Sequence, residues 1–128
     1  MKRIICLLAV LACLMMLCGC RETKIKENAA VTLHFYDIVQ ELTAEESEKV
    51  IEILNGNTYK DVFTSGVPAC GFSEEVSFEI NGKFYCIAMD TCSRVRGFGS
   101  LRYFSVSEDG MDYIHALFEK YGGYFPCV

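Results

Sequence analysis

The chain has 128 residues, of which 52% are hydrophobic, and this is enough for one domain with a single core. Seventeen acidic residues outnumber twelve basic ones, which gives a formal net charge of −5. An acidic surface repels phosphate groups, so the composition argues against nucleic acid as a partner.

The N-terminal segment has the pattern of an export signal. Lys2 and Arg3 form a basic start, an apolar run follows from Ile4 to Cys18, and the small residue Gly19 precedes a cysteine. A membrane-spanning helix needs roughly 20 apolar residues, whereas charged residues resume here at position 21. A short apolar run between a charged start and a small residue is typical of a cleaved signal peptide. We therefore expect residues 1–19 to be removed.

The end of this segment, Leu17-Cys18-Gly19-Cys20, resembles the lipobox of bacterial lipoproteins. The resemblance covers residues 1–20 only. It implies that Cys20 receives a diacylglyceryl thioether and becomes the mature N-terminus. It also implies that the protein is anchored to the bacterial cell membrane and faces outside the cytoplasm, with the outer membrane as the alternative in a Gram-negative host. Two or three acyl chains hold a protein stably on a bilayer, whereas a single chain binds only marginally.

Residues 20–30 are polar, with charges of alternating sign and no periodic apolar face. We interpret them as the lipidated N-terminus and a tether, which reaches at most about 35 Å when extended. Residues 31–128 then form one domain. Residues 1–19 carry two of the basic residues and none of the acidic ones, so the formal charge of the mature chain is −7. An anionic membrane repels such a domain, and the lipid alone has to attach it.

The predicted elements start with a half-buried strand over residues 31–36, where apolar and polar side chains alternate. Thr43-Ala44-Glu45-Glu46 matches a capping box, which predicts a helix that stops at Asn55-Gly56. Residues 58–63 are interpreted as a short edge strand.

A β-hairpin is predicted around Asn81-Gly82, because both residues of such a turn must accept a positive φ. A two-residue turn sets the register, so that Phe78 faces Tyr85. One face of the hairpin is then apolar and comprises Val76, Phe78, Ile80, Tyr85, Ile87 and Met89. The opposite face comprises Ser77, Glu79, Phe84, Cys86 and Ala88.

A further strand is predicted over residues 101–106. Ser107 then caps a second helix, which ends at Gly122-Gly123. The apolar stripe of this helix comprises Met111, Ile114, Leu117, Phe118 and Tyr121. The order β-α-(β)-β-β-β-α predicts an α+β fold, in which two helices pack on one face of a small antiparallel sheet.

Cysteines other than Cys20 in the mature chain are Cys70, Cys86, Cys92 and Cys127. An even number in a small exported domain predicts disulfides. Spacings of sixteen, six and thirty-five residues without a CxxC motif indicate neither a zinc site nor a thioredoxin-like redox pair.

The hairpin register favours the disulfides Cys70–Cys92, at the open end of the hairpin, and Cys86–Cys127. The second bond would fix the tail of residues 124–128 across the face of the sheet opposite the helices. Two other connectivities are open, namely Cys70–Cys127 with Cys86–Cys92, and Cys70–Cys86 with Cys92–Cys127. The Cα atoms of a true pair must lie within about 7 Å of each other.

Catalytic motifs such as GxSxG, HExxH or a P-loop do not occur in the sequence. His34 lies on the strand side opposite Leu33 and Phe35, and His115 lies at the border of its helix stripe. We therefore expect no enzyme, no cofactor and no metal. One alternative is a small hydrolase or thiol enzyme that uses His34 or His115 with a free cysteine. Another alternative is a structural envelope lipoprotein.

Three arginines, Arg94, Arg96 and Arg102, cluster in this otherwise acidic domain, among glycines that let backbone N–H groups approach an anion. An ordinary loop, whose arginines balance nearby acids, is the alternative. Tyr36 and Phe84 place aromatic rings on the sheet face away from the helices, which either the C-terminal tail or a partner covers. We predict a non-enzymatic module that uses these five residues to bind an extracytoplasmic protein, a peptide or a small anion. Immunity and inhibitor lipoproteins are examples of this class.

Overall fold

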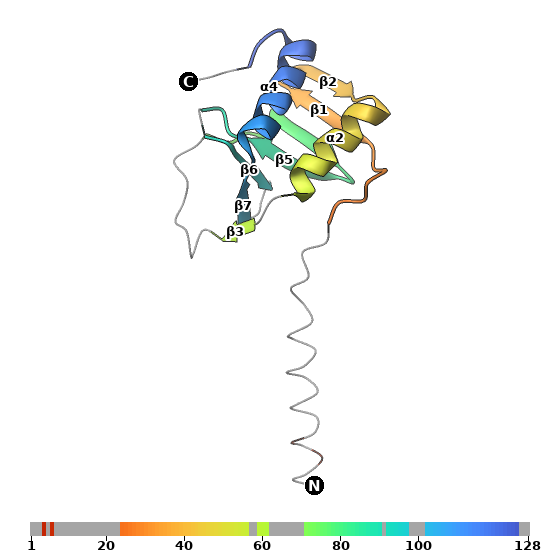
Figure 1. The fold of residues 1–128 in the computed structure, drawn as a ribbon, viewed down its shortest axis with the longest axis vertical. Helices are drawn as coiled ribbons and strands as arrows, with labels where there is room; N and C mark the ends of the chain where they lie inside the picture. The colour runs from red at the N-terminus through yellow and green to blue at the C-terminus, as the bar shows by residue number, and fades with distance from the viewer. Residues whose placement is uncertain are drawn as a thin grey trace.

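The computed structural model describes residues 24–56, 59–61, 71–90, 92–97 and 102–125, together with Ile4 and Cys6. In this part of the chain, seven strands form one antiparallel sheet in the order β2-β1-β4-β5-β6-β7-β3. Helices α2 and α4 lie together on one face of the sheet (Figure 1). The predicted α+β fold, with two helices on one face of an antiparallel sheet, is therefore confirmed.

The elements follow the predicted order, with two additional strands. Their bounds are β1 Val31–Phe35, β2 Ile38–Glu41, α2 Ala44–Asn55, β3 Tyr59–Asp61, β4 Val76–Ile80, β5 Lys83–Ile87, β6 Arg94–Gly97, β7 Arg102–Ser105 and α4 Glu108–Gly122.

The first additional strand, β2, forms a hairpin with β1 through the two-residue turn Tyr36-Asp37. Tyr36 adopts a φ of 53°, which is a costly conformation for a bulky residue. Glycine and asparagine are the usual residues at such a position. The sequence therefore gives no local signal for this turn, and the expected strand over residues 31–36 ends one residue earlier.

The second additional strand, β6, lies between β5 and β7. It contains Arg94 and Arg96, which the sequence places in a loop. The physical reason for the difference is that backbone pairing on both sides stabilises a strand whose own residues, Arg-Val-Arg-Gly, have a weak preference for one.

The β4–β5 hairpin has the predicted register, since Phe78 pairs with Tyr85 and Ser77 pairs with Cys86. Asn81 and Gly82 in its turn have φ values of 52° and 75°. The predicted apolar face of this hairpin is also confirmed, because its side chains belong to the core between the sheet and the helices. The core residues from the sheet are Val31, Leu33, Phe35, Val76, Phe78, Ile80, Ile87, Val95 and Phe104, and those from the helices are Val50, Ile51, Leu54, Met111, Ile114, Leu117 and Phe118.

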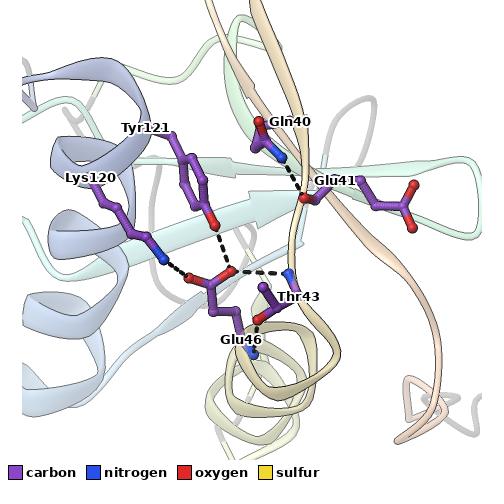
Figure 2. Close-up of polar contacts among 6 residues, drawn as sticks. All are labelled: Gln40, Glu41, Thr43, Glu46, Lys120 and Tyr121. Carbon is purple, nitrogen blue, oxygen red and sulfur yellow. Dashed lines mark hydrogen bonds and ion pairs between the residues drawn. The ribbon is translucent and has the colours of Figure 1, made fainter.

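Helix α2 begins with the predicted capping box. The N–H of Glu46 donates to Oγ1 of Thr43 at 3.2 Å, and the N–H of Thr43 donates to Oε2 of Glu46 at 3.0 Å. The same carboxylate accepts hydrogen bonds from Nζ of Lys120 at 2.6 Å and from the hydroxyl of Tyr121 at 2.8 Å. Figure 2 shows how Glu46 thereby joins the start of α2 to the end of α4.

Helix α4 has Ser107 at its N-cap, and Gly123 ends it in the left-handed conformation with a φ of 85°. Both ends agree with the sequence prediction. Helices commonly end in this way, because glycine has no Cβ to oppose a positive φ.

The segment interpreted as a tether is docked onto the domain from Ile25 onward. The N–H of Ile25 donates to Oδ1 of Asn55 at 2.9 Å, and Nδ2 of Asn55 donates to the carbonyl of Ile25 at 2.8 Å. The side chains of Ile25 and Ala29 pack against the core. The boundary between tether and domain therefore lies before Ile25 rather than at residue 30, because apolar burial and the Asn55 side chain hold this segment on the domain.

The C-terminal tail packs on the helix side of the sheet as far as Phe125. The Phe125 ring is buried against Phe118 and stacks on His115, and Tyr124 packs against Phe35. The predicted route across the opposite face is therefore wrong for these two residues, because the core offers their rings aromatic partners. In the part of the chain that is described, no helix has the length and apolar character needed to cross a membrane.

Candidate functional site

The face of the sheet that points away from α2 and α4 is called the outer face here. It brings together several side chains that could bind a ligand or take part in a reaction. One cross-strand row runs over it through four neighbouring pairs of strands. This row consists of His34, Ser77, Cys86, Arg96 and Tyr103. Side chains alternate between the two faces of a strand, and Phe78, Val95 and Phe104 point into the core from the same strands.

His34 and Glu79 form a hydrogen-bonded pair near one end of the outer face. Nε2 of His34 lies 2.8 Å from Oε2 of Glu79, and both side chains are partly exposed. The Phe84 ring lies beside the imidazole, with 5.3 Å between the ring centroids. The sequence singles out Phe84 for this face, and the structure places it there in a half-buried position. The contact of His34 with Glu79 depends on the β1–β4 pairing, which has no local sequence signal.

Arg94 and Arg96 lie on the outer face near the other end, because the residue between them, Val95, points into the core. Both arginines are half-buried. The guanidinium carbon of Arg94 lies 5.3 Å from the centroid of the Tyr103 ring, which is a cation–π distance. Tyr103 is absent from the residues that the sequence predicts for the site, because its position depends on the pairing of β6 with β7.

The other two predicted binding residues are Tyr36 and Arg102. Tyr36 lies in the β1–β2 turn rather than in a strand, and it packs edge-on against Phe35, which belongs to the core. Arg102 begins β7 opposite Asp61 of β3, at a backbone position that alternates with that of Tyr103. The prediction that Tyr36 contributes its ring to the sheet face away from the helices is therefore wrong, because the residue lies in a turn. The side chain of Arg102 lies outside the described part of the chain.

Cys86 lies at the centre of the outer face and is buried. Burial and the charge of Glu74 raise the pKa of its thiol, Arg96 lowers it, and the resulting pKa is about 11. Such a thiol is protonated at neutral pH, so Cys86 in this environment does not supply a thiolate nucleophile.

The predicted disulfides involve residues outside the described ranges, namely Cys70 and Cys127. Cys86 and Cys92 are free thiols in the structure. Their pairing with Cys127 and Cys70 stays a prediction.

His115 lies on α4, away from the outer face, where it stacks on Phe125 with 4.0 Å between the ring centroids. Burial lowers its pKa, although Asp112 and Glu119 oppose this shift. Its Nε2 is buried without a hydrogen-bond partner. His115 therefore acts as an aromatic packing residue, against which the C-terminal tail lies.

Within the described ranges, no three His, Cys, Asp or Glu side chains lie together in an arrangement that could hold a metal ion.

Comparison of the chain with models of protein families, with curated proteins and with solved structures gave no match. The chemistry of the outer face therefore has to be interpreted from the residues of this chain. Its features are the two arginines, the Tyr103 ring beside Arg94, the Phe84 ring beside His34, and the histidine–carboxylate pair.

Proposed function

We propose that this protein is a bacterial lipoprotein whose exported domain is a non-enzymatic binding module. Lipid on Cys20 anchors it to the membrane, and the half-buried arginines Arg94 and Arg96 of the outer face bind an extracytoplasmic partner through a carboxylate or another anionic group. The partner is a protein, a peptide or a small molecule that bears such a group. The centre of this face, with Ser77 and Cys86, is buried and takes no direct part.

The observation that carries this proposal is the pair Arg94 and Arg96 beside Tyr103 on one sheet face. The guanidinium carbon of Arg94 lies over the Tyr103 ring, 5.3 Å from its centroid, and such a cation–π contact leaves the N–H donors of a guanidinium able to bind an anion. A planar carboxylate accepts two such N–H groups at once. Because the mature chain has a formal charge of −7, long-range attraction of an anion is weak. Direct contact with the arginines then has to provide the affinity.

Two features favour binding over catalysis on this face. The Cys86 thiol is buried and has a pKa of about 11, and His34 on the same face lies two strands away from it, at about 10 Å across β4. Neither group is arranged as a nucleophile with its general base.

Reversing the charge of the arginine pair tests the proposal. The full chain with its anchor is used for affinity capture from native membranes, and the binding of the captured partner is then titrated. The variant Arg94→Glu/Arg96→Glu is expected to bind at least about tenfold more weakly, as is usual when charges at an interface are reversed.

The matched control is Lys24→Glu/Lys49→Glu, which changes the net charge equally at exposed positions outside the outer face. This control is expected to bind as the wild type does. Thermal unfolding of each variant verifies that the fold is intact. Wild-type affinity in a folded Arg94→Glu/Arg96→Glu variant would contradict the proposal.

A further inference from the structure

Strand β2 lies at one end of the sheet and has a neighbouring strand, β1, on one side only in the described part of the chain (Figure 1). The N–H of Leu42 donates to the carbonyl of Val31 at 2.9 Å. In an antiparallel pair, every second residue faces the partner strand with its backbone groups. Ile38 and Gln40 therefore pair with β1, whereas Val39 and Glu41 direct their N–H and C=O groups away from it.

The carbonyl of Glu41, which points away from β1, is in contact with the Gln40 side chain. Nε2 of Gln40 donates to this carbonyl at 2.8 Å (Figure 2). Donors and acceptors on the open side of an edge strand are the groups that an additional strand pairs with.

The side chains around this edge are apolar and exposed. Val39 is 64% exposed and Ile38 is 37% exposed, and the adjacent rings of Tyr36 and Tyr124 are 44% and 56% exposed. Proteins usually protect an edge strand with lysine, proline or a bulge. The residues of β2, Ile-Val-Gln-Glu, include neither lysine nor proline, and the β1–β2 register is regular from Thr32 to Phe35.

Acidic side chains surround the same edge. At the end of β2, Glu41 and Leu42 line a cavity of about 510 Å³, whose walls also include Glu27 and Glu48. Asp37 is exposed at the other end of the strand. A second copy of this acidic chain is disfavoured at such an edge by repulsion between like charges, whereas a cationic segment complements it.

We propose that β2 binds an extended, cationic segment of a partner protein as an additional strand of the sheet. Apolar side chains of that segment contact Val39 and Tyr36, and a lysine or arginine side chain enters the cavity between Glu41 and Glu48. This surface is separate from the outer-face arginines and has the opposite charge, so the two sites select different ligands.

The test titrates the purified domain with a fluorescently labelled nonapeptide that alternates valine or threonine with lysine. A second peptide has the same sequence with N-methyl groups on alternate backbone amides, which preserves the charge and removes the hydrogen bonds. The first peptide is expected to bind and the second is expected to lose at least about tenfold in affinity. Equal binding of both peptides would overturn the proposal, because charge alone would then explain the interaction.

Variants of the edge strand complete the experiment. Val39→Pro removes an outward N–H, which an edge strand tolerates, and Val39→Lys keeps the backbone intact but adds a repelling charge. Both are expected to weaken the peptide at least about tenfold, and Glu48→Gln is expected to weaken it and to reduce its salt dependence. Asp112→Asn, at an exposed position of α4, makes the same acid-to-amide change away from the edge, serves as the control and leaves peptide affinity unchanged.

Two other results would also overturn the proposal. One is unchanged peptide affinity in a folded Val39→Lys variant. The other is a dimer of the wild-type domain in sedimentation experiments that Val39→Lys dissociates, since β2 would then be occupied by a second copy.

Discussion

Gly122 of α4 packs directly against the Phe35 ring of β1. A Cβ atom on Gly122 would lie 2.3 Å from Cδ1 and 2.5 Å from Cε1 of Phe35. The Phe35 ring cannot retreat freely, because it packs against Phe118 and Tyr124. Gly122→Ala is therefore expected to lower the free energy of unfolding by roughly 1–3 kcal/mol, as overpacking of a core usually does.

Urea denaturation of the two proteins measures this difference. Gly71→Ala is the matched control, since the nearest atom to its added Cβ is the flexible end of Met89 at 3.4 Å. The control is expected to change the unfolding free energy by no more than about 0.5 kcal/mol. Equal effects of the two substitutions would mean that α4 and β1 are less tightly packed than described.

Residues of the candidate site were predictable from the sequence only where composition marked them. Arg94 and Arg96 stand out as basic residues in an acidic domain, and Phe84 stands out on the polar side of a hairpin whose register the turn defines. Tyr103 and Glu79 do not stand out in the sequence by composition or pattern. The place of Tyr103 comes from the pairing of β7 with β6, a strand that the sequence does not predict. The place of Glu79 comes from the pairing of β4 with β1, which is distant in sequence.

At the scale of elements, the contacts of Glu46 connect the two helices. Burial works to raise its pKa, but the hydrogen bonds from Lys120, Thr43 and Tyr121 outweigh it and lower the pKa from 4.5 to about 2. Because the folded-state pKa lies below the unfolded-state value, this carboxylate stabilises the fold fully above about pH 4.5. The contribution is lost as the pH falls through about 2.

Replacing this carboxylate by its uncharged analogue tests the connection. Glu46→Gln is expected to be less stable than the wild type by roughly 1–3 kcal/mol at pH 7, because it weakens charge-assisted hydrogen bonds in a buried position. The difference is expected to shrink as the pH approaches 2. Unfolding experiments at several pH values measure it, with Glu45→Gln, an exposed neighbour in the same helix turn, as the control. A stability difference that does not depend on pH would contradict the assignment.

Helix ends and the β4–β5 hairpin were predictable, because their signals are local. Thr43, Ser107 and Asn81-Gly82 each satisfy a nearby backbone requirement, and the structure has them in these roles. Strands β2 and β6 were not predictable in this way. The turn before β2 has a tyrosine at a positive φ instead of the usual glycine or asparagine, so the sequence does not indicate it. The arginine-rich segment of β6 is extended because β5 and β7 pair with it on both sides.

At the scale of the whole molecule, the α+β architecture distributes different chemistry to different surfaces. The helices and the inner sheet face contain the core, the outer face carries Arg94 and Arg96, and the β2 edge is apolar with acidic surroundings. A domain attached through its N-terminal segment can expose the latter two surfaces to separate partners.

Lipid attachment at Cys20 is the claim on which the account depends most. Its test is metabolic labelling of the full chain in a bacterial host with a clickable palmitate analogue, followed by carbonate washing of the membranes. The wild type and Cys18→Ala, which retains the lipidation cysteine and has alanine in the lipobox, are expected to incorporate the label and to stay in the washed membranes. Cys20→Ala is expected to incorporate no label and either to leave the membrane or to keep residues 1–19 uncut. A Cys20→Ala variant that is processed normally, incorporates the label and resists carbonate washing would contradict the account.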